Sequence, residues 1–257
     1  MVFKVISKNK LTAYALLLIL TVMSLITLKS TGAHAVFYGY NFKKLPIYSV
    51  ETESKKIAIS FDCAWGVDYT DRLLSIMKTH DVTCTFFATE FWVKKYPEYV
   101  KKISEMGHEW GTHSATHPYM SRLDKNAILS ELSSSKKAIE DITGKTVELF
   151  RPPYGDYSDC VIETAEELNM FTIQWSVDSL DWKDLSASEI KNRVVNKTTN
   201  GSIILFHNQG LHTAEALEEI ILTLKERGYE FVSIGKLIYK EDYQMLPDGT
   251  QKRLNEQ

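Results

Sequence analysis

Residues 57–62 read Ile57-Ala-Ile-Ser-Phe-Asp62, a short apolar run that ends in a carboxylate. Similar apolar runs follow at 82–88, 108–112, 147–150, 171–176, 202–207 and 231–234, and amphipathic helices are expected between them, for example at 70–79, 124–142 and 213–227. Gly107, Gly144 and Gly228 stand where helices should stop, each shortly before a strand. This alternation predicts an α/β fold in which helices cover a parallel sheet.

The polar residues that follow the strands favour a barrel over an open sheet. Asp62, His113, Arg151, Asp178 and His207 each follow the C-terminal end of a different apolar run. In a (β/α) barrel these ends converge on one rim, where catalytic groups collect, whereas an open sheet would spread them along a wider line. Seven strands in place of eight predict a distorted, incompletely closed (β/α) barrel.

The N-terminal segment has the composition of an export signal. Residues 11–28 contain no charge, follow three lysines and approach the length that crosses a bilayer. Ala33-His34-Ala35 resembles a signal-peptide cleavage site. Residues 1–35 are therefore expected to be a cleaved signal peptide or a retained membrane anchor. The lysines before the apolar run predict that the rest of the chain is exported, either anchored to the membrane and facing outside or secreted to the cell wall or spore envelope.

The rest of the chain is expected to be one acidic domain with two flanking segments. Residues 36–56 are interpreted as a connecting arm, residues 57–240 as the folded domain and residues 241–257 as a polar tail that frays. The formal charge of the 257-residue chain is −3, and it becomes −7 without the four lysines of residues 1–35. A domain that acidic has no electrostatic footprint for nucleic acid, and a neutral or cationic substrate fits it better.

The cysteines predict neither disulfides nor a paired-cysteine metal site. Cys63, Cys84 and Cys160 are odd in number and irregularly spaced. Cys84 lies in an apolar run and is expected to be a core residue, whereas nothing in the sequence assigns a role to Cys160.

Four polar residues have the types and positions that a hydrolytic site needs. His113 and His117 are four residues apart, a spacing that puts two imidazoles on the same side of one helical turn. Zinc, cobalt or nickel would accept such a pair, although the spacing also suits a surface or capping role. Asp62 ends a strand, where an unpaired carboxylate is costly to bury, so it is interpreted as a base or a metal ligand. Arg151 precedes two prolines that stiffen the turn, which suits either orienting an ionised Asp62 or forming a structural ion pair.

A second polar pair follows two other strands. His207 ends the run at 202–207, and Asp181 follows the run at 171–176. A carboxylate beside His207 would raise the pKa of the imidazole and make it a competent acid, with a buried structural histidine as the alternative. Trp182 either closes the core or forms a wall on which a sugar can stack.

Five motifs, in a fixed order, carry a resemblance to a known family. They are Ser60-Phe61-Asp62, His113-Ser-Ala-Thr-His117, Arg151-Pro152-Pro153-Tyr154-Gly155, Asp178-Ser-Leu-Asp181-Trp182 and Leu205-Phe206-His207. They resemble the signatures of the NodB-homology polysaccharide deacetylases, carbohydrate esterase family 4, over residues 55–240. Residues 45–52 and 62–66 resemble the sporulation-associated branch of that family. The resemblance implies a distorted (β/α) barrel and the metal-dependent removal of N-acetyl groups from amino-sugar polymers.

The resemblance also implies catalytic roles for five residues. Asp62 matches the general base, and Arg151 matches the residue that positions it. His207 matches the general acid, and Asp181 matches the carboxylate that orients this acid. The backbone N–H of Tyr154 matches a donor of the oxyanion hole.

Metal and substrate positions are implied in the same way. His113 and His117 match the ligands of a divalent metal, zinc in the first place and cobalt or nickel as alternatives. Leu205 matches the pocket for the acetyl methyl group, Trp182 a wall of the substrate groove, and Pro153 a further substrate-binding position.

One position departs from the family pattern. The family has a second aspartate in the first motif, where it binds the metal, and this chain has Cys63 there. A thiolate can bind zinc. Cys63 is therefore either a replacement ligand or a buried thiol beside a two-histidine site that water completes.

Together these features predict an exported enzyme that deacetylates an N-acetylated glycan polymer, with peptidoglycan as the first choice and a chitin-like polymer as the second. The membrane is a partner if the N-terminal segment is uncleaved. An esterase that removes O-acetyl groups from xylan would use the same residues. A catalytically weak wall-binding protein is the third reading, because an aspartate of the family pattern is missing.

Overall fold

The computed structural model describes residues 17–19 and 43–254. The described residues from Lys44 onward belong to one compact unit. Residues 17–19 are helical, and no helix within the described ranges is long and apolar enough to cross a membrane. Apart from residues 17–19, the predicted signal peptide or anchor lies outside the described residues, as does the first part of the predicted arm.

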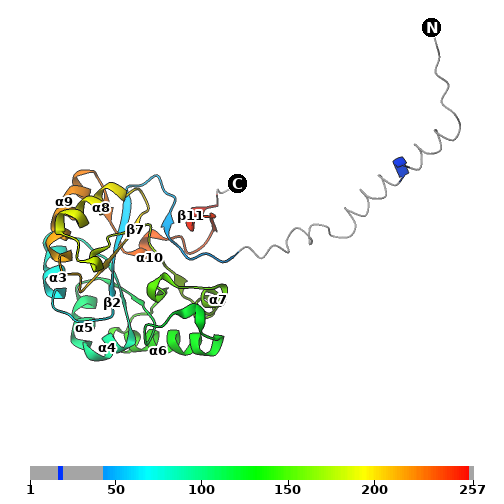
Figure 1. Ribbon diagram of the computed structural model, residues 1–257, viewed down its shortest axis with the longest axis horizontal. Helices are drawn as coiled ribbons and strands as arrows, with labels where there is room; N and C mark the ends of the chain where they lie inside the picture. The colour runs from blue at the N-terminus through cyan, green and yellow to red at the C-terminus, as the bar shows by residue number, and fades with distance from the viewer. Residues whose placement is uncertain (1–16, 20–42, 255–257) are drawn as a thin grey trace, which may run out of the picture. The chain divides into compact units, whose positions relative to one another are not determined.

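A curled parallel sheet forms the centre of this unit (Figure 1). Its strands follow the order β6-β5-β4-β3-β2-β8-β7, and β9 pairs with β2. All of these ladders are parallel. Since β6 and β7 stand at opposite ends of this order, the barrel is incompletely closed, and the expected distorted (β/α) barrel is confirmed. The strands are β2 (Lys56–Cys63), β3 (Thr85–Ala88), β4 (Glu109–Thr112), β5 (Leu149–Phe150), β6 (Phe171–Thr172), β7 (Val177–Asp178), β8 (Ile203–His207) and β9 (Glu230–Phe231).

Most strands are shorter than the apolar runs that predicted them. The run at 171–176 contributes only β6, and the chain then leaves that ladder and starts β7 at Val177, a strand that was not expected. The reason is local, because the N–H of Gln174 donates to Ile47 O at 2.7 Å and not to a neighbouring strand of the barrel.

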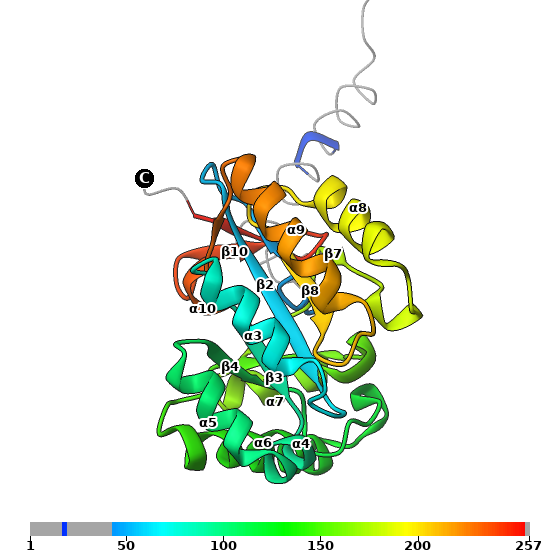
Figure 2. The ribbon, with the colours of Figure 1, turned by 90° about the vertical axis from the view of Figure 1, so that its left-hand side faces the viewer.

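Helices cover the outer face of the sheet. Figure 2 shows α3, α9 and α8 side by side in front of β2 and β8. Their apolar residues pack against Phe61 and Phe206 of these strands. The longest helix, α6, begins where Asp124 accepts the N–H of Ala127 and ends at Gly144 with a φ of 66°, as the glycine predicted. The helices are α3 (Thr70–Thr79), α4 (Glu90–Lys95), α5 (Pro97–Glu105), α6 (Lys125–Thr143), α7 (Asp159–Glu167), α8 (Ala187–Lys197), α9 (Thr213–Glu226) and α10 (Ile234–Leu237).

The two flanking segments belong to the fold, which corrects the sequence-based prediction. Residues from the arm form β1 (Ser49–Val50), which joins the hairpin of β10 (Tyr243–Met245) and β11 (Thr250–Arg253) in a second sheet. Ile47 donates its N–H to Thr172 O at 2.9 Å and lies beside the open side of the barrel. Ile47 and Val50 are buried with Ile173 and Ile203 in the barrel interior. An open barrel edge needs backbone partners and an apolar filling, and these segments supply both.

Candidate active site

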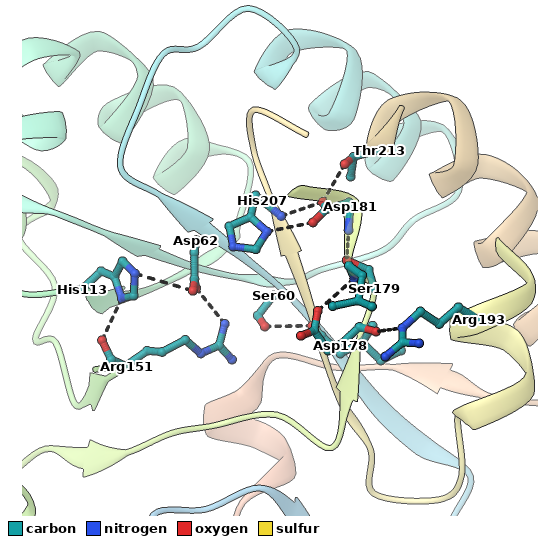
Figure 3. Close-up of polar contacts among 12 residues, drawn as sticks. Ser60, Asp62, His113, Arg151, Asp178, Ser179, Asp181, Arg193, His207 and Thr213 are labelled. Carbon is teal, nitrogen blue, oxygen red and sulfur yellow. Dashed lines mark hydrogen bonds and ion pairs between the residues drawn. The ribbon is translucent and has the colours of Figure 1, made fainter. Parts of the chain in front are cut away.

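The C-terminal ends of the central strands bring the predicted polar residues together. β2 and β8 run in a register that pairs Asp62 with His207, while His113 and Arg151 directly follow β4 and β5. Figure 3 shows two polar groups, one around Asp62 and Arg151 and the other around Asp181 and His207. They border a pocket of about 540 Å³, whose lining includes Asp62, His113, His117, Tyr154, Trp182, Leu205 and His207.

The Asp62 carboxylate is buried and paired with Arg151. Arg151 Nη1 donates to Asp62 Oδ1 at 2.8 Å, and the two side chains are 0% and 7% exposed. Burial by itself would raise the pKa of Asp62, but the positive charge of Arg151, together with nearby histidines, outweighs it and holds the pKa below its usual value. Asp62 is therefore ionised at neutral pH. Its second oxygen, Oδ2, lies 3.6 Å from His113 Nε2.

The turn after β5 explains how the guanidinium reaches Asp62. The N–H of Arg151 donates to Thr112 O at 2.9 Å, which keeps this residue in line with the end of β4. Pro152 and Pro153 then restrict the backbone. Tyr154 adopts a left-handed conformation with φ 59° and ψ 8°, which is uncommon for a residue other than glycine. The chain therefore turns sharply at the pocket wall.

His113 and His117 meet on a loop and not on a helix. Ser114 and His117 have positive φ values of 70° and 62°, so the expectation of a helical turn is wrong. The two imidazole rings still approach edge to face, with centroids 4.9 Å apart. His113 Nδ1 donates to Arg151 O at 2.7 Å, which leaves Nε2 with its lone pair.

Glu131 of α6 holds this loop in place. Its Oε2 accepts the N–H groups of Ala115 and Thr116, both at 2.8 Å, and its Oε1 accepts the Thr116 hydroxyl at 2.7 Å. One carboxylate thus binds Ala115 and Thr116, which lie between His113 and His117 in the loop. A strained backbone of this kind persists only when its surroundings hold it.

His207 is held by a buried carboxylate with no free oxygen. Asp181 Oδ1 accepts His207 Nδ1 at 2.7 Å, while Oδ2 accepts the His207 N–H at 2.8 Å and the Thr213 hydroxyl at 2.6 Å. Burial by itself would lower the pKa of His207, but the hydrogen bond and charge of Asp181 outweigh it and raise the pKa above its usual value. A Cβ on Gly210 would lie 2.1 Å from the Thr213 hydroxyl, so only glycine fits there. Nε2 is left as the ring nitrogen for a substrate proton.

Two of the three predicted substrate residues line the pocket. Trp182 is 56% exposed and Leu205 is 3% exposed, and both contribute to the lining. Pro153 is buried and is not among the lining residues. Its part is therefore to shape the turn before Tyr154, and the pocket gives no support for a direct substrate contact.

The comparisons with known proteins agree with this geometry. A family model described as polysaccharide deacetylase matches residues 49–173. The peptidoglycan-N-acetylmuramic acid deacetylase PdaA of Bacillus subtilis is 35% identical over 202 residues, which are 77% of this chain and 77% of PdaA. The chain belongs to the polysaccharide deacetylase family.

Other similar proteins include an uncharacterized protein and a pseudoenzyme. The uncharacterized protein YlxY of Bacillus subtilis is 36% identical over 193 residues, 75% of this chain, and the match spans 60% of YlxY. The structure of BA3943 from Bacillus anthracis, described as a carbohydrate esterase family 4 pseudoenzyme, matches with a TM-score of 0.74 and 36% identity over 81% of this chain and 70% of that one. A BA3943 mutant with restored enzymatic activity matches equally well, at 37% identity.

The two histidines have the chemistry of metal ligands. Burial lowers the pKa of His113, and it lowers the pKa of His117 to about 4, so both imidazoles are neutral at pH 7. His117 Nδ1 is buried without a hydrogen-bond partner among the described residues, which is rare unless another ligand binds it. However, no group of three or more His, Cys, Asp or Glu side chains within residues 43–254 is arranged to hold a metal. The chain supplies two imidazoles, and water would have to complete the coordination.

Cys63 lies in the core and not in the pocket. Successive side chains of a strand point to opposite faces, and Cys63 is fully buried in the same apolar cluster as Phe61. It is not among the residues that line the pocket. Burial raises the pKa of the Cys63 thiol well above its usual value, so no thiolate is available at neutral pH. The placement favours the buried-thiol interpretation over metal ligation.

Sequence reasoning did not single out Glu131, Thr213 or Trp65. Thr213 begins the helix after the strand of His207, and a hydroxyl at that position could have suggested a partner for the site. Trp65 follows the first motif closely, where an aromatic residue outside a strand was a usable signal. Glu131 gave no signal, since a carboxylate on a surface helix is normally solvated.

Proposed function

We propose that the chain hydrolyses the N-acetyl groups of amino sugars in peptidoglycan, releasing acetate and leaving a free amine on the glycan. This proposal rests on one observation, which is that a carboxylate base and a histidine acid lie in the same pocket. Arg151 holds the pKa of Asp62 below its usual value, while Asp181 raises the pKa of His207 above its usual value. Amide hydrolysis needs a base for the water and an acid for the leaving amine.

Asp62 acts first in the proposed reaction. Its Oδ1 is occupied by Arg151, so Oδ2 is free to take the proton of a water molecule that attacks the acetamide carbonyl. The N–H of Tyr154, presented by the left-handed turn, donates to the oxyanion of the tetrahedral intermediate. A divalent metal held by His113 and His117 would polarise the carbonyl, with zinc, cobalt or nickel as suitable ions.

His207 completes the reaction. Its Nδ1 is committed to Asp181, so Nε2 donates its proton to the departing amine. The buried carboxylate fixes both the tautomer and the orientation of the ring. Leu205 offers an apolar contact for the acetyl methyl group, and Trp182 offers an exposed ring to the sugar.

We also propose that the domain works outside the cytoplasm, in the cell wall or spore envelope. This proposal rests on the lysines and the apolar run of residues 1–35, together with the peptidoglycan substrates in the names of relatives such as PdaA. Cell fractionation with an antibody against the domain would test it, and recovery from the cytoplasm alone would contradict it.

The test of the activity is acetate release from purified peptidoglycan by the full-length chain in detergent, with and without added zinc or cobalt. Asp62→Asn and His207→Gln should each abolish release, because they remove the base and the acid. Asp248→Asn, in the turn between β10 and β11, is the control and should leave the rate unchanged. Release from acetylated xylan but not from peptidoglycan would select the O-acetyl esterase instead.

A second function, binding of the wall with little catalysis, is favoured by two observations. Cys63 occupies the position of the family's aspartate ligand, and the family contains the pseudoenzyme BA3943. This alternative predicts that the chain sediments with peptidoglycan but releases no acetate with any divalent metal. It also predicts that binding to peptidoglycan survives Asp62→Ala, because binding alone needs no base.

A further inference from the structure

The Asp181 carboxylate has one partner besides the histidine that it orients. His207 supplies two of its three hydrogen bonds, and the Thr213 hydroxyl supplies the third, at 2.6 Å from Oδ2. Figure 3 shows Asp181 between these two residues. Within the described residues, no other group donates a hydrogen bond to this carboxylate. Asp181 is 0% exposed, so bulk water cannot take the place of a lost donor.

The loop that carries Asp181 fixes its backbone but not its carboxylate. Leu180 adopts a left-handed conformation with a φ of 55°, and its N–H donates to Asp178 Oδ1 at 2.8 Å. The N–H of Asp181 donates to the Ser179 hydroxyl at 3.3 Å. These contacts hold the main chain of the loop. The orientation of the two carboxylate oxygens therefore depends on contacts from outside the loop.

The Thr213 hydroxyl is held in place because this residue begins a helix. Thr213 is the first of the 14 residues of α9, and its N–H donates to Gly210 O at 3.2 Å. A Cβ on Gly210 would lie 2.1 Å from the Thr213 hydroxyl and 2.7 Å from Asp181 Oδ2, so the turn packs directly against this contact. The partial positive charge at the N-terminal end of a helix also favours a nearby carboxylate. The start of α9 therefore provides Asp181 with a fixed donor.

Thr213 itself does not reach the substrate. It is 0% exposed and is not among the residues that line the pocket. Any effect of its hydroxyl on the reaction must therefore pass through Asp181 to His207. The His207 ring has to keep Nδ1 on Asp181 for Nε2 to reach the leaving amine. A hydrogen bond to a charged group is roughly twice as strong as one between neutral groups, so the hydroxyl can hold the carboxylate in place.

We propose that Thr213 is a positioning residue for the acid of the reaction. Its hydroxyl holds the Asp181 carboxylate in the orientation that binds Nδ1 and the backbone N–H of His207 together, so that Nε2 stays presented to the substrate. The proposal rests on the acid role of His207 argued above and adds a residue to it. Without the hydroxyl, one oxygen of a buried carboxylate loses a donor, and the carboxylate turns away from the geometry that orients the ring.

The first measurement is acetate release from peptidoglycan by the full-length chain in detergent with added zinc. Thr213→Ala removes the hydroxyl and should lower kcat roughly 10-fold, as expected for the loss of one hydrogen bond to a charged group. KM should be unchanged, because the substrate does not touch this residue. Thr213→Ser keeps the hydroxyl and should retain most of the parent's kcat. Thr164→Ala is the matched control and should keep the parent's kcat, since Thr164 is equally buried and its hydroxyl donates to Cys160 O at the start of α7.

The second measurement needs neither substrate nor metal. The full-length chain with isotope-labelled histidine should give a nuclear magnetic resonance signal for the ring N–H of His207, assigned by its absence from His207→Gln. The hydrogen bond to Asp181 protects this proton from exchange with water, so the signal should persist in the parent, in Thr213→Ser and in Thr164→Ala. It should be lost through fast exchange in Thr213→Ala, because the carboxylate is then less firmly held.

The outcomes also separate this proposal from the proposed activity. If the parent releases acetate and Thr213→Ala matches Thr164→Ala in kcat and in the His207 signal, the positioning role is contradicted and the deacetylase stands. If the parent releases no acetate but the His207 signal is lost only in Thr213→Ala, the positioning role is supported and the deacetylase is contradicted. Equal losses of kcat in Thr213→Ala and Thr213→Ser would also overturn the proposal, because the hydroxyl would then have no part in the effect.

Discussion

Replacing Arg151 by methionine should destabilise the protein strongly at neutral pH. Arg151 is the main countercharge of Asp62, and both side chains are almost fully buried. Methionine has a similar volume, so the main loss is the charge and not the packing. Removal of one partner from a buried ion pair costs about 3–5 kcal/mol. For a domain of this size that corresponds to roughly 6–20 °C in melting temperature.

The loss of stability in Arg151→Met should depend on pH. In the native chain the lowered pKa of Asp62 contributes stability that is present above the unfolded-state pKa of about 3.9 and is lost as the pH falls through the lower folded value. Without Arg151, the largest contribution that offsets burial is lost and the pKa of Asp62 rises. The difference in stability between Arg151→Met and the parent should therefore be largest near neutral pH and shrink as the pH falls towards about 4, where the carboxyl group accepts a proton.

The assay is urea unfolding at a series of pH values in chelator-treated buffer. The double variant Arg151→Met/Asp62→Asn should recover most of the loss, because an amide needs no countercharge. Lys102→Met is the control, since its ion pair with Asp71 is exposed and such pairs contribute little. A loss that is independent of pH, or a double variant as unstable as Arg151→Met, would refute the reasoning.

The other predictions concern the boundaries, the acid, the histidine loop and the thiol. A chain that begins near Val36 should fold alone, whereas one that begins at Ile57 should melt at a lower temperature because it lacks the buried Ile47 and Val50; equal melting curves would contradict this. Asp181→Asn should move the alkaline limb of acetate release to lower pH, because the largest contribution that raises the pKa of His207 against burial is then lost, and an unmoved limb would count against the pairing. Glu131→Gln should reduce zinc content after dialysis, as His113→Ala and His117→Ala do, while Glu140→Gln should not; zinc retained in Glu131→Gln would show that the loop needs no such support. Cys63→Ser should retain the zinc content of the parent if the thiol is a core residue, and a clear loss would restore it as a ligand.

Much of the candidate active site was predictable, because the positions of its residues follow from the order of the strands along the chain. Polar residues that directly follow buried parallel strands must gather at one rim, and the register that pairs Asp62 with His207 shows this directly. The pairing of Arg151 with Asp62 and of Asp181 with His207 also agrees with the sequence-based hypothesis. Each of these predictions needed only the order of strands and the types of residues that end them.

Other features could not be derived in this way, because they depend on contacts between distant segments. The side chain of Glu131 reaches a loop 15 and 16 residues away, and the Asp181 carboxylate accepts the hydroxyl of Thr213, 32 residues away. The arm looked like a linker because Ile47 and Val50 are isolated apolar residues. Their contribution is visible only in the structure, where they are buried at the open side of the barrel.

The amino-acid sequence by itself determined the alternation of strands and helices, the family and the residues that carry charge into the pocket, since local hydrophobic patterning and motif spacing are properties of the chain. Only the tertiary structure decided that Cys63 faces the core while Asp62 faces the pocket, that the two histidines sit on a strained loop, and that the terminal segments complete the barrel. The physical reason is the same in each case. Which face a side chain occupies, and which backbone groups lack partners, are settled only when the sheet has curled and its open edge must be filled.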